Sequence, residues 1–239
     1  MKSSDMNTIE NTIAKINESL ADLPFDFAFL GGSILSLLVT DDTVDTIRVT
    51  KDVDVIVDVK TRRDFHAVER LLEKLGFKHD TREGAPVCRW IYDDTTIDIL
   101  PIREDVLGWK SKWFGEALQT AQVRPCGGGQ AKIISPPYFV ALKLEAFEER
   151  GEGNFLYSTD FEDVICLFNG RETIADEIGC DATLAKLLGS KFKVYLDSPE
   201  LEDAIDGFVQ TEINPSERKV AIISRMKMVA AFAEAMPVS

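Results

Sequence analysis

Three aspartates dominate the chemistry that the sequence offers. Asp52 and Asp54 stand two residues apart in the alternating run Asp-Val-Asp-Val-Ile-Val-Asp-Val, and Asp98 occurs in a later apolar segment. On a β-strand, residues i and i+2 lie on the same face, about 7 Å apart along the chain. With Asp98 on a neighbouring strand, the carboxylates would form the oxygen-rich kind of site that Mg²⁺ prefers. We therefore predict that these three aspartates bind two Mg²⁺ ions, or Mn²⁺ in their place, for two-metal phosphoryl or nucleotidyl transfer.

A Gly31-Gly32-Ser33 turn fits the same chemistry. Glycines at a strand-to-helix turn let the backbone approach a ligand closely, and a helix N-terminus presents N–H groups to phosphate. Alone, this tripeptide is more often a plain turn, and an isolated Asp-x-Asp is more often a solvated strand face. Together they favour a metal and phosphate site, because acids that share one face of an apolar strand need a compensating cation.

Hydrophobic periodicity indicates the elements that would position these residues. The expected N-terminal elements are helices over 7–20, 34–39 and 62–75, strands over 25–30 and 52–59, and a hairpin of strands 90–92 and 95–100. Gly76 is a stop signal for the third helix. Asp93-Asp94 would form the hairpin turn, although a turn containing glycine would be a clearer signal.

The run Gly127-Gly128-Gly129, with Pro136-Pro137 beyond it, is the best candidate for a domain boundary. After it, helical spacing recurs over 138–149, 160–168, 182–188, 201–208 and 216–235, which predicts a helical bundle. We therefore expect two domains, 1–130 and 131–239. The fold class would be α+β, with a small mixed sheet flanked by helices and followed by the C-terminal bundle.

Composition narrows the function classes. Of the 239 residues, 45% are hydrophobic, so the chain can bury a core. The net charge of −14 opposes non-specific attraction to nucleic acid, so such a substrate would need a few placed cations. No apolar run approaches the roughly 20 residues of a membrane span, and the N-terminus is polar. We expect a cytoplasmic protein without a membrane partner.

The four cysteines are scattered and form no Cys-x-x-Cys pair, and the sequence has two histidines. A structural zinc site is therefore not expected. We interpret the thiols as reduced core or surface residues rather than as a disulfide framework.

The order of the motifs along the chain resembles that of the nucleotidyltransferase fold that is shared with DNA polymerase β. The glycine turn is followed by Arg48-Val-Thr-Lys-Asp52-Val-Asp54 and then by a third aspartate on a later strand. More narrowly, Arg-x-Thr-x-Asp-x-Asp looks like the toxin-type nucleotidyltransferases of the AbiEii/AbiGii and MenT group. Two later segments, from Pro137 to Arg150 and from Ser158 to Asp163, look like that group's K-L-x-A-x-x-x-R and S-x-D-x-x-D stretches.

The resemblance implies a set of site residues. Glycine-turn residues would contact the triphosphate, the aspartates would bind magnesium, a lysine would face the phosphates, and Asp160 or Asp163 would be an accessory acid. The catalytic residues of this set are Asp52, Asp54, Asp98 and Lys143, and the nucleotide-binding residues are Gly31, Gly32, Ser33, Arg48, Lys51, Asp160 and Asp163.

Residue patterns alone allow simpler roles for the helical members of this set. Lys143 would be a surface lysine paired with nearby helix residues. Arg150 would be a solvated cation at a helix end, and Asp160 would be the N-cap of a helix over 161–168.

The expected reaction moves a nucleoside monophosphate from a triphosphate to an acceptor hydroxyl and releases pyrophosphate, with Asp98 assisting deprotonation of the acceptor. By resemblance, the acceptor is a tRNA 3′ end or a protein side chain; a small-molecule hydroxyl is a further option, and a cognate antitoxin is an expected partner. A different class of function is a non-catalytic interaction protein with the same fold. The candidate cations for a tRNA are Arg48, Lys51, Arg103, Lys110 and Lys112.

Overall fold

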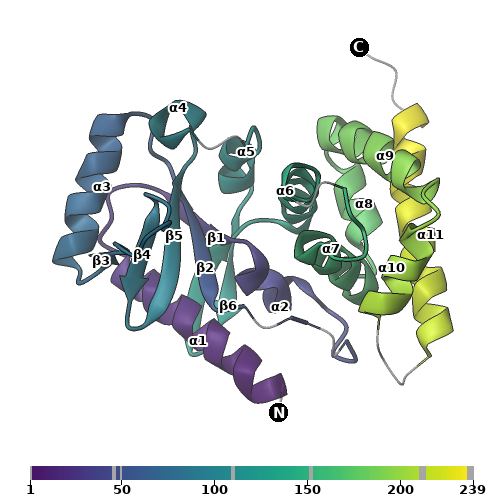
Figure 1. Cartoon of the computed structure of the whole chain (residues 1–239), viewed down its shortest axis with the longest axis horizontal. Helices are drawn as coiled ribbons and strands as arrows, with labels where there is room; N and C mark the ends of the chain where they lie inside the picture. The colour runs from purple at the N-terminus through teal and green to yellow at the C-terminus, as the bar shows by residue number, and fades with distance from the viewer. Residues whose placement is uncertain are drawn as a thin grey trace. The chain divides into compact units, whose positions relative to one another are not determined.

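The computed structural model describes residues 2–44, 47–48, 50–108, 111–150, 153–209 and 214–235 (Figure 1). It divides into two compact units. The first unit is Met1–Leu37 with Val49–Tyr138, and the second is Leu38–Arg48 with Phe139–Ser239. The sequence analysis divided the chain after residue 130 and did not assign residues 38–48 to the C-terminal part.

The first unit contains a seven-stranded mixed sheet with the strand order β3-β4-β5-β2-β1-β7-β6. β2 pairs antiparallel with β1 and parallel with β5, and β1 pairs parallel with β7. The strands are β1 (Phe27–Leu30), β2 (Asp52–Val57), β3 (Lys78–His79), β4 (Arg89–Tyr92), β5 (Thr95–Pro101), β6 (Gln122–Cys126) and β7 (Gly129–Ile133).

β2 lies inside the sheet and has two different faces. Val53, Val55 and Val57 are fully buried, whereas Asp52 and Asp54 alternate with them on the opposite face. The predicted period of two is therefore confirmed, with the strand ending two residues earlier than expected. Burial of the valines holds β2 in place and fixes the direction of its acids.

The β4–β5 hairpin turns at Asp93-Asp94, as predicted. Both residues have positive φ, 44° and 64°, as a two-residue hairpin turn of this hand requires. Aspartate tolerates this conformation better than most residues. The turn fixes the register, in which Tyr92 pairs with Thr95 and Arg89 pairs with Asp98.

Helices accompany the sheet in the first unit. They are α1 (Lys2–Ser19), the 3₁₀ turn η1 (Gly32–Ile34), α2 (Leu35–Leu38), α3 (Arg62–Lys74), α4 (Glu104–Leu107) and α5 (Phe114–Gln119). α1 packs against β6 and β7 through buried apolar residues, as the helix expected over 7–20 requires. Thr61 is the N-cap of α3, and its side chain accepts from the Asp64 backbone N–H; the helix stops before Gly76, as predicted. The helix expected over 34–39 is shorter, because Ile34 belongs to η1 and α2 ends at Leu38.

The sequence analysis did not predict β6 and β7. The Gly127-Gly128-Gly129 run joins these two strands: Gly127 has φ +54°, and a Cβ there would lie 2.5 Å from Asn11 Oδ1. β6 is mostly exposed and carries a proline, so it lacks the alternation that marks a half-buried strand.

The second unit is built mainly from helices, which confirms the predicted helical C-terminal part. They are α6 (Pro136–Glu149, which starts in the first unit), α7 (Thr159–Gly170), α8 (Ile174–Gly179), α9 (Ala182–Leu196), α10 (Leu201–Phe208) and α11 (Pro215–Ala235). α11 packs against α7, α8 and α9. Aromatic rings fill the core, with Phe147 5.0 Å from Phe161 and 5.7 Å from Tyr195 between ring centroids. α8 was not predicted, and α9 is longer than expected.

Two further expectations concern the cysteines and membrane-spanning helices. All four cysteines are free thiols: Cys88, Cys126 and Cys166 are buried and Cys180 is exposed. Within the described ranges, no helix has both the length and the apolar character that a membrane crossing needs.

Candidate active site

The three predicted aspartates lie on one face of the sheet in the first unit. Asp54 and Asp98 are direct partners in the parallel β2–β5 pairing, and Asp52 pairs with Thr96 two residues before. Paired residues on neighbouring strands point to the same side. We call Asp52, Asp54 and Asp98 the acid face. The placement of Asp98 beside Asp54 meets the condition on which the sequence-based site depended.

The glycine turn packs directly against the acid face. β1 ends at Leu30, which pairs with Asp54, and Gly31 follows with φ +77°. A Cβ added at Gly31 would lie 2.0 Å from Asp54 Oδ2, so the carboxylate occupies the space that any side chain would need. The backbone of the turn therefore borders the same space as the acids.

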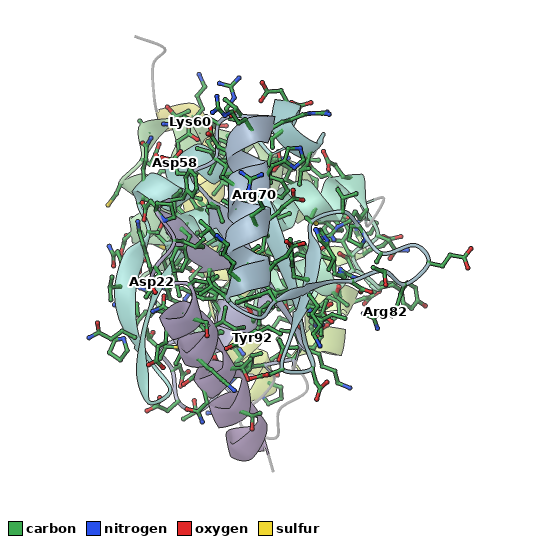
Figure 2. All side chains as sticks on the ribbon, turned by 90° about the vertical axis from the view of Figure 1, so that its left-hand side faces the viewer. Asp22, Asp58, Lys60, Arg70, Arg82 and Tyr92 are labelled. Carbon is green, nitrogen blue, oxygen red and sulfur yellow. The ribbon has the colours of Figure 1, made fainter. Side chains whose placement is uncertain are left out.

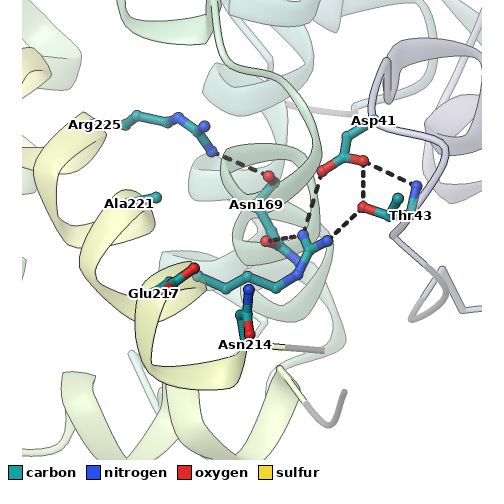
Figure 3. Close-up of a pocket in the computed structure, with 8 residues that line it drawn as sticks. Asp41, Thr43, Asn169, Asn214, Glu217, Ala221 and Arg225 are labelled. Atoms are coloured by element: carbon teal, nitrogen blue, oxygen red, sulfur yellow. Dashed lines mark hydrogen bonds and ion pairs between the residues drawn. The ribbon is translucent and has the colours of Figure 1, made fainter. Parts of the chain in front are cut away.

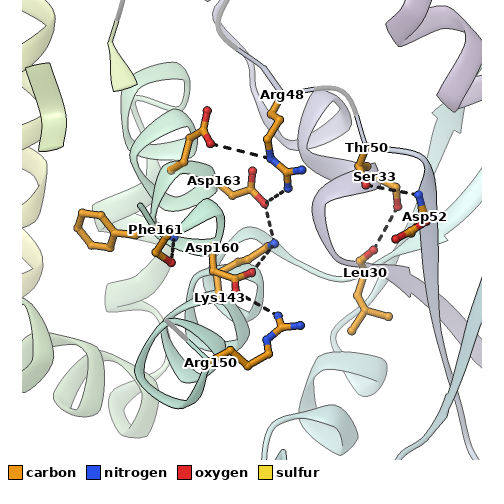
Figure 4. Close-up of polar contacts among 12 residues, drawn as sticks. Leu30, Ser33, Arg48, Thr50, Asp52, Lys143, Arg150, Asp160, Phe161 and Asp163 are labelled. Atoms are coloured by element: carbon orange, nitrogen blue, oxygen red, sulfur yellow. Dashed lines mark hydrogen bonds and ion pairs between the residues drawn. The ribbon is translucent and has the colours of Figure 1, made fainter. Parts of the chain in front are cut away.

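Ser33, the third residue of this turn, is buried. Its hydroxyl donates to the carbonyl oxygen of Leu30 at 3.3 Å (Figure 4). The hydroxyl proton of Ser33 is thus engaged in a hydrogen bond within the turn. The four-residue α2 that follows is too short to add much of a helix dipole. Close backbone approach at Gly31 and Gly32 is the stronger contribution of the turn.

Sequence reasoning missed Arg89. It lies on β4 opposite Asp98 and donates to both carboxylate oxygens, from Nε to Oδ1 at 2.8 Å and from Nη2 to Oδ2 at 2.8 Å. The side chains are 28% and 14% exposed. Hydrogen bonding to Asp98 raises the pKa of Arg89, so the guanidinium is always charged. The acid face thus contains its own cation.

The Arg89 contact decides how well the predicted metal set fits. Among the residues that the structure describes, no three Asp, Glu, His or Cys side chains are arranged to hold a metal ion. Asp98 is already engaged through both oxygens by Arg89. As arranged, the three-carboxylate set therefore does not fit Mg²⁺. A hard cation prefers carboxylate oxygen and retains waters, so binding of Mg²⁺ by the other two acids of the face stays a prediction.

The second unit contains a separate ion cluster around Lys143 on α6. Its Nζ lies 3.0 Å from Asp160 Oδ1 and 2.6 Å from Asp163 Oδ2 on α7 (Figure 4). Burial acts to lower the pKa of Lys143, but the charges of Asp163 and Asp160 outweigh it and raise the pKa. The interpretation of Lys143 as a surface lysine is therefore wrong, because its side chain is 11% exposed.

Asp160 and Asp163 are built into this cluster rather than into a helix cap. Ser158 is the N-cap of α7 and accepts from the Phe161 backbone N–H at 3.2 Å. Asp160 lies inside the first turn, so its interpretation as the N-cap is wrong. It also accepts from Arg150 at 3.1 Å, although Arg150 is 72% exposed, as expected of a cation at a helix end.

Arg48 joins the same cluster from the segment that precedes β2. Its Nη2 lies 3.5 Å from Asp163 Oδ2, and its Nε lies 4.0 Å from Glu162 Oε2. Burial raises the pKa of Glu162, and Arg48 opposes this effect. The second unit thus brings together four of the predicted residues: Arg48, Lys143, Asp160 and Asp163.

The first unit brings together the other predicted residues, with the exception of Lys51. Gly31, Gly32, Ser33 and the acid face are neighbours. Lys51 is exposed and precedes β2. Among the cations considered for tRNA, Arg103 forms a bidentate pair with Asp105, and Lys110 lies outside the described residues.

A cavity of about 340 Å³ lies in the second unit and was not anticipated (Figure 3). Arg218 crosses it and donates to Asn169 Oδ1 at 2.9 Å and to Thr43 Oγ1 at 2.6 Å. Arg225 donates to the backbone carbonyl of Asn169 at 3.0 Å, near the end of α7. These arginines hold residues 41–43 and the end of α7, which gives the cavity walls a structural role.

No protein-family model matches the sequence, and no curated protein matches it. Two solved structures are similar over most of the chain. An antigenic nucleotidyltransferase-like protein from Paracoccidioides brasiliensis is 19% identical, with a TM-score of 0.50, over 89% of this chain and 92% of that one. A protein from H. pylori described as a candidate nucleotidyltransferase is 15% identical, with a TM-score of 0.50, over 98% and 97%. The chain therefore has the fold of nucleotidyltransferase-like proteins.

Proposed function

We propose that the protein is a nucleotidyltransferase that moves a nucleoside monophosphate from a nucleoside triphosphate to an acceptor hydroxyl and releases pyrophosphate. The observation that carries this proposal is the close packing of the glycine turn against Asp54. A turn that presents backbone N–H groups attracts phosphate, and carboxylates beside it attract the cation that phosphate brings.

The residues of the first unit would have different roles in this reaction. Gly31 and Gly32 would let the triphosphate approach the backbone of the turn, because neither residue carries a side chain of its own. Asp52 and Asp54 would hold Mg²⁺, or Mn²⁺, which when bound neutralises phosphate charge and polarises the reacting phosphorus. Asp98 is the third acid and is held by Arg89. The roles that the family resemblance gives to Lys143, Asp160 and Asp163 stay predictions.

The acceptor and the biological role are finer proposals that follow the motif resemblance. A toxin-type enzyme would modify tRNA 3′ ends or a protein side chain, and a cognate antitoxin would restrain it. The net charge of −14 and the internal pairing of Arg48 and Arg103 disfavour broad capture of a polyanion. Recognition of a tRNA would then depend on a small number of cations such as Lys51 and Lys112.

Transfer is tested with the purified chain, Mg²⁺ and each α-labelled nucleoside triphosphate in turn, in the presence of total tRNA or of protein from a cell lysate. Label should appear in one acceptor class, and Asp54→Asn should reduce it to background. The matched control is Asp58→Asn, which removes the same charge just beyond the end of β2 and should leave the rate unchanged. Wild-type transfer by Asp54→Asn would show that the acid face is not the site.

A second candidate function is a non-catalytic protein that uses the fold for binding. The Arg89–Asp98 pair favours it, because an acid that is already neutralised does not need a metal ion. Thermal unfolding with Mg²⁺ and each triphosphate separates the two functions, since a ligand that binds only the folded state raises the melting temperature. A rise with one triphosphate supports the enzyme, and no rise with any supports the binding protein.

A further inference from the structure

The cavity of about 340 Å³ in the second unit has a polar lining (Figure 3). Among the described residues that line it, all except Ala221 carry a polar or charged side chain. Sites for small molecules have volumes of about 300–1,000 Å³ and orient their ligands through a few placed polar groups. The size and lining of this cavity therefore suit a small, hydrophilic ligand.

Arg225 on α11 uses only one nitrogen of its guanidinium group within the protein. Nη1 donates to the backbone carbonyl oxygens of Phe168 and Asn169, near the end of α7. Nε and Nη2 have no hydrogen-bond partner in the described part of the chain, and neither atom is enclosed. Glu172 and Asp41 act on Arg225 through their charge, without a hydrogen bond. The half-buried guanidinium therefore has two donors available to the cavity that it lines.

The available edge of Arg225, formed by Nε and Nη2, is the edge by which other arginines of this protein bind carboxylates. Arg82 donates to Asp80 from these two atoms, at 2.8 and 2.6 Å, on the surface of the first unit (Figure 2). Arg89 donates to Asp98 from the same two atoms, both at 2.8 Å. Two parallel N–H groups match the two oxygens of a carboxylate. Arg225 therefore offers the cavity a donor pair that fits a carboxylate.

Asn169 adds a second donor to the same lining. Its Oδ1 accepts from Arg218 at 2.9 Å, and since arginine can only donate, the other end of the amide must be the NH₂ group. Asn169 is 6% exposed, yet no described residue accepts from its Nδ2, and this atom is not enclosed. Polar groups of buried side chains are normally hydrogen-bonded. The Asn169 amide can therefore donate to a ligand in the cavity.

The other charges of the lining limit what a ligand can carry. Asp41 accepts from Arg218 and from Thr43, so the charges of Asp41 and Arg218 are paired within the wall. Glu217 is exposed and precedes Arg225 by eight residues on α11. This spacing corresponds to about 12 Å along the helix axis. A second negative group on a ligand would be repelled by Glu217, which favours a ligand with one carboxylate.

We propose that this cavity binds a small hydrophilic monocarboxylate, which Arg225 holds through Nε and Nη2 and to which the Asn169 amide also donates. Thr43 and Asn214 provide further polar groups for hydroxyls of the ligand. The cavity belongs to the second unit, whereas the glycine turn and the acid face belong to the first. The inference therefore does not depend on nucleotidyl transfer.

The test is a titration of the full chain with gluconate, a monocarboxylate with hydroxyl groups, followed by saturation-transfer NMR without metal ion or nucleotide. Gluconate should bind, and Arg225→Gln should weaken binding at least about tenfold, because charge-assisted hydrogen bonds are lost. Arg225→Lys should lose most of the affinity as well, since lysine keeps the charge but not the paired donors. Lys193→Gln is the control: it removes a surface charge of the same unit and should change the affinity by less than about threefold.

Two variants at Ala221 keep the test independent of any loss of stability in Arg225→Gln. Ala221 lines the cavity one helical turn before Arg225, and glutamate followed by arginine at i+4 is a favourable helix pair. Ala221→Glu supplies an internal carboxylate for Arg225, so it should raise the melting temperature and abolish gluconate binding. Ala221→Gln has nearly the same size without the charge. It should bind gluconate at least about tenfold more tightly than Ala221→Glu.

The remaining outcomes would overturn the proposal. Equal weakening by Arg225→Gln and Lys193→Gln would reduce the effect to general electrostatics, and equal affinities of the two Ala221 variants would show that Arg225 does not recognise the carboxylate. Preferred binding of succinate or inorganic phosphate would show that the ligand is not a monocarboxylate. If none of the three anions bound, Arg225 would have its structural role alone. Because the assay contains no triphosphate, its failure is distinguishable from a failure of nucleotidyl transfer.

Discussion

Gly31 illustrates how much one residue without a side chain can determine. Its φ of +77° and ψ of −171° belong to a region that only glycine enters readily, and Asp54 fills the space beside it. The backbone strain and the steric conflict are independent of each other, so their costs should add.

We expect Gly31→Ala to destabilise the protein by more than the roughly 1–3 kcal/mol of the backbone strain alone. Gly84→Ala is the control, since Gly84 also has positive φ, +81°, but nothing lies within 4 Å of its added Cβ. Urea unfolding of both variants gives the difference, which measures the conflict with Asp54. Equal losses of stability would show that Asp54 moves aside without cost.

Lys143 offers a second test at the scale of one residue. Lys143→Met should cost about 3–5 kcal/mol of unfolding free energy, because it leaves Asp160 and Asp163 without their buried cation. Lys193→Met is the control: Lys193 pairs with Glu234 on the surface of the same unit, and its loss should change little. A small effect of Lys143→Met in chemical denaturation would contradict the structural importance of the cluster.

The pH dependence of this contribution follows from the sign of the shift. The pKa of Lys143 is raised above its ordinary value of 10.5, with the charges of Asp163 and Asp160 outweighing burial. The stabilisation is therefore fully present below about pH 10.5 and is lost as the pH rises through the higher, folded-state pKa. The stability difference between wild type and Lys143→Met should be constant near neutrality and should shrink in strong alkali, as measured by denaturation at each pH.

Among the elements, the β4–β5 hairpin shows what the sequence could predict. The turn at Asp93-Asp94 was recognised, and a two-residue loop implies that Tyr92 faces Thr95 and, counting outward, that Arg89 faces Asp98. The pairing of Arg89 was thus available from the sequence. It was missed because the strand was taken to begin at Trp90, one residue too late.

Other elements could not be predicted for physical reasons. β6 is an exposed edge strand that contains a proline, so it has no hydrophobic period to detect. The burial of Lys143 depends on two acids that are supplied by a different helix, and no local pattern encodes that pairing. The acid face and the glycine turn were predictable because their chemistry is concentrated in short motifs on buried strands.

The backbone conformation of the β4–β5 turn predicts a stabilising substitution. Asp94 has φ +64°, which glycine adopts with less strain than aspartate. Asp94→Gly should therefore stabilise the protein slightly, visible as a higher melting temperature, because relief of strain at positive φ outweighs the greater freedom of glycine in the unfolded chain. Asp94→Val is the opposite control and should destabilise, since a β-branched residue resists positive φ. If Asp94→Gly lowered the melting temperature, the assigned turn conformation would be incorrect.

For the whole molecule, the reactivity of the cysteine thiols measures how well the hydrophobic cores of the two units exclude an alkylating reagent. Burial raises the pKa of Cys88 to about 12 and that of Cys126 to about 11, and Cys166 is buried as well. Only the thiolate reacts with iodoacetamide, so these three should be inert at about pH 8. Mass spectrometry of the native protein should therefore show one modification, at Cys180, and unfolding in urea should expose all four sites.

The path of the chain through its two units has a practical consequence for dissection. The backbone changes units at residues 37–38, 48–49 and 138–139, and the short insert between the first two changes is anchored by Gly170, whose carbonyl accepts from the Thr40 and Asp41 backbone N–H groups. A fragment that stops at Tyr138 would retain this insert but lose its anchor, and the complementary fragment would lack one of its own pieces. Neither half is therefore a natural expression unit. If the two fragments were mixed, the eleven residues Leu38–Arg48 of the first fragment would have to pack into the unit formed by the second.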